Sequence, residues 1–172
     1  MNEDHEGTFS IRVATPDDRL AVSSLFEASY PTLLRRHYLS SLLAVALPLL
    51  TRANPMLLAC GTFFVAESEV GDVLGCGGWT RERSGKGDTA SQLAHIRHFA
   101  TDPRHTRHGI GRALYLACEG QARAAGINRF ECYASLNAEA FYAALGFRRV
   151  QMIDLELASR TTLPAVWMTR SV

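Results

Sequence analysis

The chain has 172 residues, of which 47% are hydrophobic and 20% are charged, and its formal net charge is +1 at pH 7. This length fits one domain with a buried core, so we expect a single domain over residues 1–172. A net charge so close to zero gives no field to attract nucleic acid or an anionic membrane, and we expect neither as a partner.

The first residues, Met1–Ser10, are polar and acidic. They lack the apolar core of a signal peptide, and residues 1–8 are expected to be a disordered tail. The longest apolar stretch, Leu42–Leu50, is interrupted by Pro48 and is too short to cross a bilayer. The four cysteines, which are Cys60, Cys76, Cys118 and Cys132, show no C-x-x-C spacing. We therefore expect them to be reduced thiols, and we expect the protein to be cytoplasmic.

The first half of the chain reads as a strand, several helices and two further strands. The predicted strands are Phe9–Ala14, Thr62–Glu67 and Val73–Thr80, the last two joined by a turn at Glu69–Asp72. A helix is predicted from Pro16 to Tyr30, where Pro31 ends it, and one or two more over 33–58, broken near Pro48 and Pro55. The polar segment Arg81–Gln92 is expected to be a mobile loop.

The second half alternates strands and helices. We predict a strand ending near Ala100, a helix at Gly109–Ala125, a strand at Arg129–Ala134, a short helix after Asn137, and strands at Arg148–Leu155 and Leu163–Met168. There is no repeat and no linker. These elements predict one α/β domain with a mixed, mostly antiparallel sheet.

The most informative segment is Thr106–Ala113, TRHGIGRA, with its following helix. A strand that passes through a glycine turn into a helix presents unpaired N–H groups at the positive end of the helix dipole, which suits a pyrophosphate. Two other phosphate loops do not fit. The dinucleotide fingerprint needs a third glycine where this chain has Leu114, and the nucleoside-triphosphate loop needs a lysine that is missing.

This segment resembles motif A of the GCN5-related N-acetyltransferases (GNAT), [QR]-x-x-G-x-[GA], with Thr106 where the family usually has Gln or Arg. A second segment, Asn137–Phe147 (NAEAFYAALGF), resembles motif B, with Gly146 suited to a left-handed helix C-cap and Asn137 to an N-cap. Because both motifs occur in the expected order, the chain is identified as a member of this family. The resemblance is specific over roughly the C-terminal half.

The resemblance implies the GNAT fold, an α/β (α+β) domain whose mixed, mostly antiparallel sheet is flanked by helices and splayed between the fourth and fifth strands, ending at Ala100 and Ala134. It also implies acetyl-CoA as co-substrate. The thioester would accept hydrogen bonds from the amides of Phe99, Ala100 and Thr101, and Asn137 and Tyr142 would contact the CoA arm. The residues expected around the CoA phosphates are Arg104, His105, Arg107, His108, Gly109, Ile110, Gly111 and Arg112.

Acetyl transfer to an amine needs a proton donor for the departing thiolate and a base for the amine. Tyr142 matches the family's general acid, and a phenol with a pKa of ~10 is protonated at neutral pH. His95 and Glu131 are alternative bases. On a regular strand His95, Arg97 and Phe99 share one face, and Ile96, His98 and Ala100 share the other. Arg97 stands where some relatives carry a second relay histidine.

Two further expectations concern ligands. We expect no metal site, because His95 and His98 fall on opposite strand faces and His105 and His108 lack a carboxylate or thiolate companion. The acceptor pocket is expected to use aromatic side chains, which suit an amine with an apolar portion. These residues are Phe26, Tyr30 and Trp79, with the stretch Leu33–Tyr38.

The sequence therefore predicts an acetyl-CoA-dependent N-acetyltransferase that transfers the acetyl group directly, in a ternary complex, to a primary amine of a small molecule. Two alternatives stay open: an enzyme acting on protein or peptide amines, and a non-catalytic acyl-CoA-binding module that regulates a partner. A homodimer is also open. The acceptor itself is not identified by the sequence.

Overall fold

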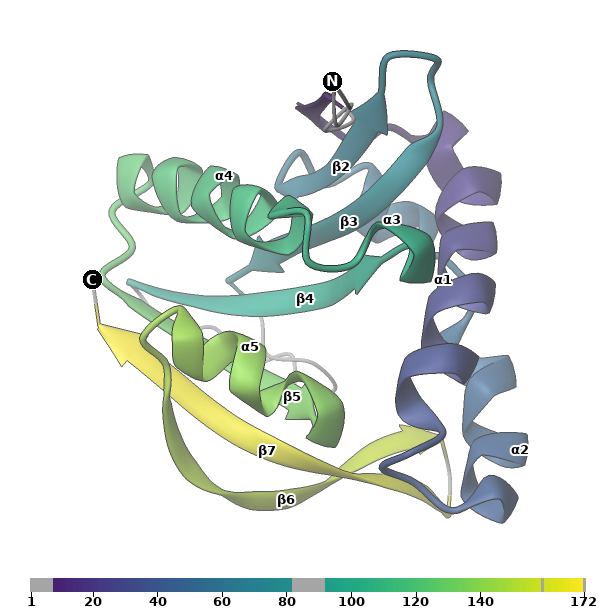
Figure 1. Cartoon of the computed structure of the whole chain (residues 1–172). Coiled ribbons are helices and arrows are strands. Elements are labelled where there is room, and N and C mark those ends of the chain that lie inside the picture. Colours follow the sequence, from purple (N-terminus) through teal and green to yellow (C-terminus); the bar gives the residue numbers. More distant parts are fainter. Residues whose placement is uncertain (1–7, 82–91, 159, 172) are drawn as a thin grey trace, which may run out of the picture.

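The computed structural model describes residues 8–81, 92–158 and 160–171. Within these residues the chain forms one seven-stranded sheet with the order β1-β2-β3-β4-β5-β7-β6 (Figure 1). The β4–β5 pair is parallel and the other described neighbours are antiparallel, which confirms the mixed, mostly antiparallel sheet. The strands are β1 (Phe9–Val13), β2 (Phe63–Ser68), β3 (Val73–Thr80), β4 (Leu93–Thr101), β5 (Arg129–Ser135), β6 (Arg148–Ala158) and β7 (Thr161–Ser171).

Helices lie on both faces of this sheet. The helix α4 and the short α5 cover one face, while α1 crosses the far end of the strands and leads into α2 (Figure 1). The largest core cluster lies beneath α4 and α5, and a second lies between the sheet and α1. The helices are α1 (Arg19–Leu34), α2 (Ser40–Leu50), α3 (Pro55–Leu58), α4 (Ile110–Ala124) and α5 (Glu139–Ala144), with 3₁₀ turns η1 (Pro16–Asp18), η2 (Pro103–His105) and η3 (Leu136–Ala138).

Helix α1 runs through Pro31 to Leu34, although a proline was expected to end it at Tyr30. Proline removes one helical hydrogen bond, but tertiary packing can outweigh that loss. Here Leu34 is buried at 3% exposure in a cluster with Tyr38 and Leu163. Packing of Leu34 against β7 therefore stabilises the last turn of α1, despite the proline within it.

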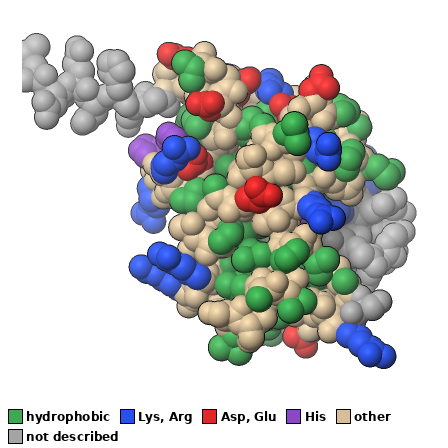
Figure 2. Space-filling model, turned by 90° about the vertical axis from the view of Figure 1, so that its right-hand side faces the viewer, with side chains coloured by type: hydrophobic (Ala, Val, Ile, Leu, Met, Phe, Trp, Pro, Cys, Tyr) green, Lys and Arg blue, Asp and Glu red, His purple; other side chains and the backbone are tan. Residues whose placement is uncertain are grey.

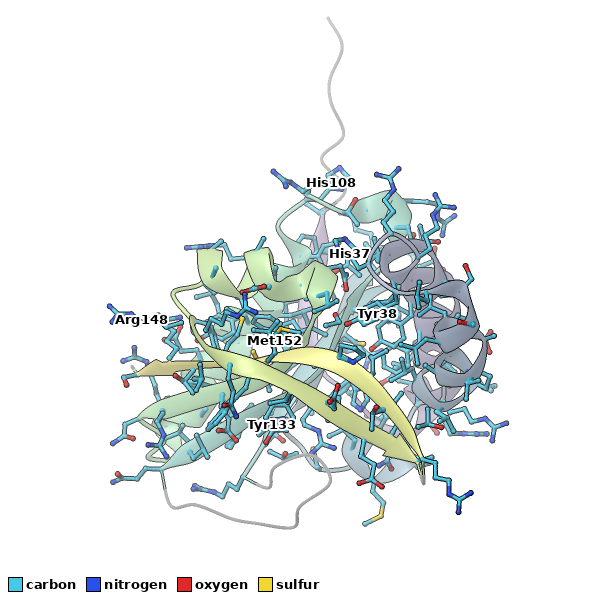
Figure 3. All side chains as sticks on the ribbon, turned by 90° about the horizontal axis from the view of Figure 1, so that it is seen from below. His37, Tyr38, His108, Tyr133, Arg148 and Met152 are labelled. Carbon is cyan, nitrogen blue, oxygen red and sulfur yellow. The ribbon has the colours of Figure 1, made fainter. Side chains whose placement is uncertain are left out.

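Tyr38, just after α1, ties three parts of the chain together. Its hydroxyl donates to the carbonyl oxygen of Pro164 in β7 at 2.8 Å and accepts from the N–H of Leu136 in η3, also at 2.8 Å. Figure 3 shows the Tyr38 side chain directed inward from the end of α1. This buried hydroxyl fixes the α1–α2 connection relative to the start of α5.

Strand β4 contains a β-bulge that the sequence did not predict. Cys76 pairs with Ala100, but Gly78 pairs with Arg97, so β4 has one residue more than β3 in this interval. His98 takes up the difference with a φ of 46°. The bulge also reflects a close approach, because a Cβ on Gly77 would lie 2.5 Å from the ring of Phe99. Only glycine lets Phe99 fold over β3 here.

The bulge makes the prediction of a regular two-sided β4 wrong beyond Arg97. Ile96 and Phe99 both pack in the cluster beneath α4, whereas Ala100 packs toward α1. A bulge inserts one residue and so exchanges the faces of all residues that follow it. As a result Phe99 lies on the α4 side with Ile96, and His98 contacts Phe26 of α1.

Beyond their first residues β4 and β5 separate, which confirms the predicted splay between the fourth and fifth strands. The pairing is limited to Leu93–His95 against Arg129–Glu131 in the described residues. From Ile96 and Cys132 onward the strands diverge, and β7 continues beside β5 to the far end (Figure 1). The opening lies between α4 and α5, so it can admit a ligand between the two halves of the sheet.

Two sequence expectations fall outside the described residues: the disordered tail, apart from Thr8, and most of the segment Arg81–Gln92. The four cysteines are free, with Cys60 exposed and the other three buried. None of the helices described is long and apolar enough to span a membrane. The face formed by α1 and α2 carries hydrophobic, basic and acidic side chains intermixed (Figure 2).

Candidate active site

A cavity of about 770 Å³ occupies the opening between β4 and β5. One end of it reaches the N-terminus of α4, and the other reaches α1, α2 and the β6–β7 strands. Residues of β4 and β5 line its middle, among them His95, Phe99, Thr101 and Tyr133, with Tyr142 from α5. The splay thus places most of the predicted site residues around one space.

The N-terminus of α4 forms the anion-binding end of this cavity. Gly109 is the N-cap with a φ of 78°, a left-handed conformation that glycine adopts without strain. Its carbonyl accepts the first helical hydrogen bond, from Ala113 N–H at 2.9 Å. The amides before Ala113 therefore have no helical partner and lie at the positive end of the dipole. This arrangement fits a phosphate group.

The basic side chains predicted around the α4 N-terminus differ in whether they line the cavity. Arg107 and Arg112 line the cavity. Arg104 instead pairs with Asp102, with Nη2 2.7 Å from Oδ2 and Nε 3.2 Å from Oδ1, and this arginine lowers the pKa of the Asp102 carboxyl. His108 is exposed, does not line the cavity, and lies at the outer edge of the molecule in Figure 3.

Gly111 has a second role beside its exposed amide. A Cβ at this position would lie 3.0 Å from the ring of Phe141 in α5. The glycine therefore allows the first turn of α4 to contact α5, across the cavity mouth. A larger residue would move α5 as well as any bound phosphate.

Asn137 does not cap α5, contrary to expectation. It lies inside η3, and Ala138 occupies the N-cap position of α5. The Oδ1 atom of Asn137 is buried without a hydrogen-bond partner in the described residues, and the side chain lines the cavity. Because a buried polar atom without a partner is costly, this oxygen is suited to an N–H donor on a bound ligand.

Tyr142 is held by the end of its own helix. Gly146, with a φ of 91°, is the predicted left-handed C-cap, and the Schellman bonds run from Phe147 N–H to Tyr142 O and from Gly146 N–H to Ala143 O. The Phe147 ring lies 5.4 Å from the Tyr142 ring, and Phe99 contacts it from the other side at 6.2 Å. Burial raises the pKa of the Tyr142 phenol well above its ordinary value, so the hydroxyl is a proton donor at neutral pH.

Where β4 and β5 are still paired, His95 and Glu131 form a buried pair. The Nδ1 atom of His95 lies 3.2 Å from Oε1 of Glu131, and both residues are at most 2% exposed. Trp167 of β7 donates its indole N–H to Oε2 of the same carboxylate at 3.3 Å. His95 lines the cavity, whereas Glu131 lies behind it. The carboxylate can therefore orient the imidazole while His95 meets the ligand.

The strand-edge amides expected to bind the thioester differ in direction. Asp102 N–H donates to Leu74 O in β3 at 2.8 Å. Successive amides of a strand point to opposite edges, so the Thr101 N–H points away from β3, toward the opening. Ala100 faces Cys76 of β3 in the ladder. Of the Ala100 and Thr101 amides, the Thr101 amide is therefore the one directed toward the cavity.

The three aromatic residues predicted for the acceptor pocket differ in their position relative to the cavity. Tyr30 lines the cavity, and Phe26 stacks behind it with ring centroids 5.0 Å apart. Trp79 does not belong to the site. It is buried on the α4 side of the sheet, where its indole N–H donates to Gln121 at 3.0 Å. The period-two pattern of β3 could not tell which sheet face this tryptophan occupies.

Sequence reasoning missed Tyr133 and Ser29, which line the same cavity, and Trp167, which lies behind it against Glu131. Trp167 and Tyr133 face each other in the β5–β7 ladder, and Tyr133 contacts His95 edge to face at 4.6 Å. Ser29 precedes the predicted Tyr30 and was not singled out. The register between β5 and β7 would have identified Trp167, but register is not visible in one sequence. In the described chain no cluster of three His, Cys, Asp or Glu side chains could hold a metal ion.

The splayed sheet and the anion-binding end of α4 are the features of an acyl-CoA-dependent transferase. Residues 24–147 match the model of the acetyltransferase (GNAT) family. Because this match spans well over half of the chain, the chain belongs to the GNAT family of acetyl-CoA-dependent acetyltransferases. A comparison with curated proteins gives no match.

Solved structures show the same fold at low sequence identity. A GCN5-related N-acetyltransferase from Rhodopseudomonas palustris is 20% identical with a TM-score of 0.73, covering 96% of each chain. PaiA N-acetyltransferase from Thermoplasma acidophilum, solved with coenzyme A, is 15% identical with a TM-score of 0.71 over 96% of this chain and 99% of that one. The ribosomal-protein-S18-alanine N-acetyltransferase from Escherichia coli is 15% identical with a TM-score of 0.64, over 96% and 94%.

Proposed function

We propose that this protein transfers the acetyl group of acetyl-CoA directly to a primary amine of a small molecule in a ternary complex. The observation that carries the proposal is the single cavity in the β4–β5 opening. It connects the anion-binding end of α4 to the buried His95–Glu131 pair, with the Tyr142 side chain lining the same space. A donor and an acceptor can therefore meet there without a covalent enzyme intermediate.

In this proposal the CoA phosphates bind at the α4 N-terminus, through the amides near Gly109 and the guanidinium groups of Arg107 and Arg112. The pantetheine arm follows the opening, where the unpartnered Oδ1 of Asn137 accepts one of its amide N–H groups. The thioester carbonyl then accepts from the Thr101 N–H. This placement directs the reactive carbon toward the acceptor side of the sheet.

The chemical step needs one proton to leave the amine and one to reach the thiolate. The amine nitrogen attacks the thioester carbon while His95 takes its proton through Nε2, since Nδ1 faces Glu131. The oxyanion is stabilised by the Thr101 amide until the carbon–sulfur bond breaks. The Tyr142 hydroxyl protonates the departing CoA thiolate. Glu131 stabilises the imidazolium, as a buried carboxylate beside a histidine does.

The experiment is a panel of amines, peptides and protein substrates incubated with acetyl-CoA and the purified protein, with acetylated products identified by mass spectrometry. We expect acetylation of small primary amines. Acetylation restricted to peptide or protein amines would replace the small-molecule proposal. Tight CoA binding with no transfer to any member of the panel would support a non-catalytic binding module instead.

A further inference from the structure

The cavity ends on the acceptor side in a wall of aliphatic side chains. We call this wall the leucine end. It lies between the helices α1 and α2 and the strands β6 and β7, and α2 contacts both strands at that end of the sheet (Figure 1). Its residues come from α1, α2, β6 and β7 and are Leu33, Leu34, Leu50, Leu155 and Leu163. Such a wall favours an apolar ligand surface by removing it from water.

The charged side chains that directly line the cavity are arginines. No Asp or Glu lines it within the described residues, whereas Arg97, Arg107 and Arg112 do. A second ammonium group on the acceptor would have to leave water and enter the leucine end without a facing carboxylate. Desolvation of an uncompensated charge is strongly unfavourable. Polycationic amines are therefore poor candidates.

A buried hydroxyl group interrupts the leucine end. The Oγ atom of Ser29 belongs to a residue with 0% exposure and has no hydrogen-bond partner in the described chain, yet Ser29 lines the cavity. Ser29 precedes Leu33 by one helical turn, so both lie on the same face of α1. A buried hydroxyl without a partner points to a ligand that supplies one. The hydroxyl is neutral, and so it suits a neutral hydrogen-bonding group.

We propose that the acceptor is a primary amine with an aliphatic body that carries one neutral hydrogen-bonding group, and that diamines and polyamines are excluded. This inference rests on the proposed acetyl transfer at the same cavity. The amine nitrogen would lie at His95, the aliphatic body along the leucine end, and the neutral group at Ser29.

Three amines with the same number of heavy atoms test this assignment. They are hexylamine, 5-aminopentan-1-ol and 1,5-diaminopentane, which end in a methyl, a hydroxyl and an ammonium group. We expect kcat/KM with acetyl-CoA to be highest for 5-aminopentan-1-ol and lower by on the order of 100-fold for 1,5-diaminopentane. Equal kcat/KM for the diamine and the other two would overturn the proposal.

Two variants locate the effect at the leucine end. Ser29→Ala should abolish the preference for 5-aminopentan-1-ol over hexylamine by lowering kcat/KM for the amino alcohol. Leu33→Glu adds a carboxylate at a half-buried position and should raise kcat/KM for the diamine while lowering it for hexylamine. Leu20→Glu is the matched control, since Leu20 lies on the same helix with 71% exposure and outside the cavity. An equal gain in Leu20→Glu would contradict the location.

Binding measured without transfer separates this proposal from the proposed function. Each amine is added to the protein saturated with CoA, and the rise in Tm is recorded. If hexylamine and 5-aminopentan-1-ol raise Tm, 1,5-diaminopentane does not, and none is acetylated, the acceptor class holds and the acetyl-transfer proposal fails. If CoA binds but none of the three amines raises Tm at millimolar concentration, the acceptor class is wrong.

Discussion

Nδ1 of His95 lies 3.2 Å from Oε1 of Glu131, so two residues that the sequence offers as alternative bases form one buried, hydrogen-bonded pair. Only His95 of this pair lines the cavity. Glu131 instead accepts from the indole N–H of Trp167 and faces Nδ1 of His95. The choice between two bases thus becomes a division of roles between a base and the carboxylate that orients it.

The pair predicts strongly non-additive kinetics. His95→Ala and Glu131→Gln should each lower kcat, on the order of 10²-fold for the histidine, while the double variant should be little worse than His95→Ala. The deficit of His95→Ala should shrink at high pH, where more of the amine is already deprotonated. Steady-state kinetics against pH measure both effects. Multiplicative losses in the double variant would mean that the two residues act independently.

Trp167 is predicted to influence the pH dependence of the reaction. Its indole N–H donates to the Glu131 carboxylate and so competes with the His95 imidazolium for that charge. Trp167→Phe should therefore favour the protonated form of the pair, and the acid limb of the kcat/KM profile should move to higher pH, by roughly half a unit to one unit for one hydrogen bond to a charged group.

A matched control exists for this change. Trp79→Phe also removes a buried indole N–H, the one bonded to Gln121, but Trp79 does not line the cavity and its indole is not bonded to the His95–Glu131 pair. Its pH profile should not move, even if its Tm falls. NMR of labelled histidine rings offers a second readout, because the His95 titration should shift in Trp167→Phe alone. An equal shift of the pH profile in both variants would show that Trp167 acts through packing and not through its hydrogen bond to Glu131.

Tyr142→Phe should lower kcat by on the order of 10²-fold with little change in KM for acetyl-CoA, because the ring stays packed while the thiolate loses its proton donor. The raised pKa of the phenol means that wild-type activity should not fall through Tyr142 deprotonation below pH 10. Tyr115→Phe is the control. It removes a buried hydroxyl bonded to Arg170 outside the cavity, and its kcat should be unaffected. Full kcat in Tyr142→Phe, with chemistry rate-limiting, would contradict the acid role.

His98 predicts a pH-dependent stability. Burial, with the nearby charges of Arg97 and His95, lowers its pKa from 6.5 to about 4. As the pH falls, His98 therefore takes up a proton in the unfolded chain before it does so in the folded protein. His98 costs no stability above pH 6.5, and the free energy of unfolding decreases as the pH falls from 6.5 toward 4. The loss is about 2–3 kcal/mol.

Urea unfolding between pH 4 and 7 measures this loss. His98→Asn keeps a side chain that tolerates a positive φ but does not titrate. The variant should show a weaker pH dependence than the wild type over this range. Parallel curves for the two proteins would show that His98 titrates normally in the folded state.

The parts of the fold that local chemistry determines were predicted from the sequence. The glycine turn before α4 and the C-cap at Gly146 follow from backbone conformations that favour glycine, and both appear where expected. The order of the strands and the splay came from the family resemblance. The end of α1 could not be predicted, because packing of Leu34 against β7 decides it rather than Pro31.

Long-range register explains the remaining differences. Trp79 and Trp167 both lie in strands with mixed patterns, and only pairing decides that one is bonded to Gln121 under α4 and the other to Glu131. The bulge at His98 likewise depends on Gly77 in the neighbouring strand. One sequence does not reveal which residues face each other across a ladder.

The extra residue in β4 makes His98 a position at which this buried strand could change its length. If His98 were deleted, β4 could pair continuously with β3, with Phe99 opposite Gly77. The pairs on either side, Arg97 with Gly78 and Ala100 with Cys76, would keep their register, so the Thr101 amide would still point toward the opening. In natural variants of this protein, the loss of one residue from β4 is therefore expected at the bulge rather than elsewhere in the strand.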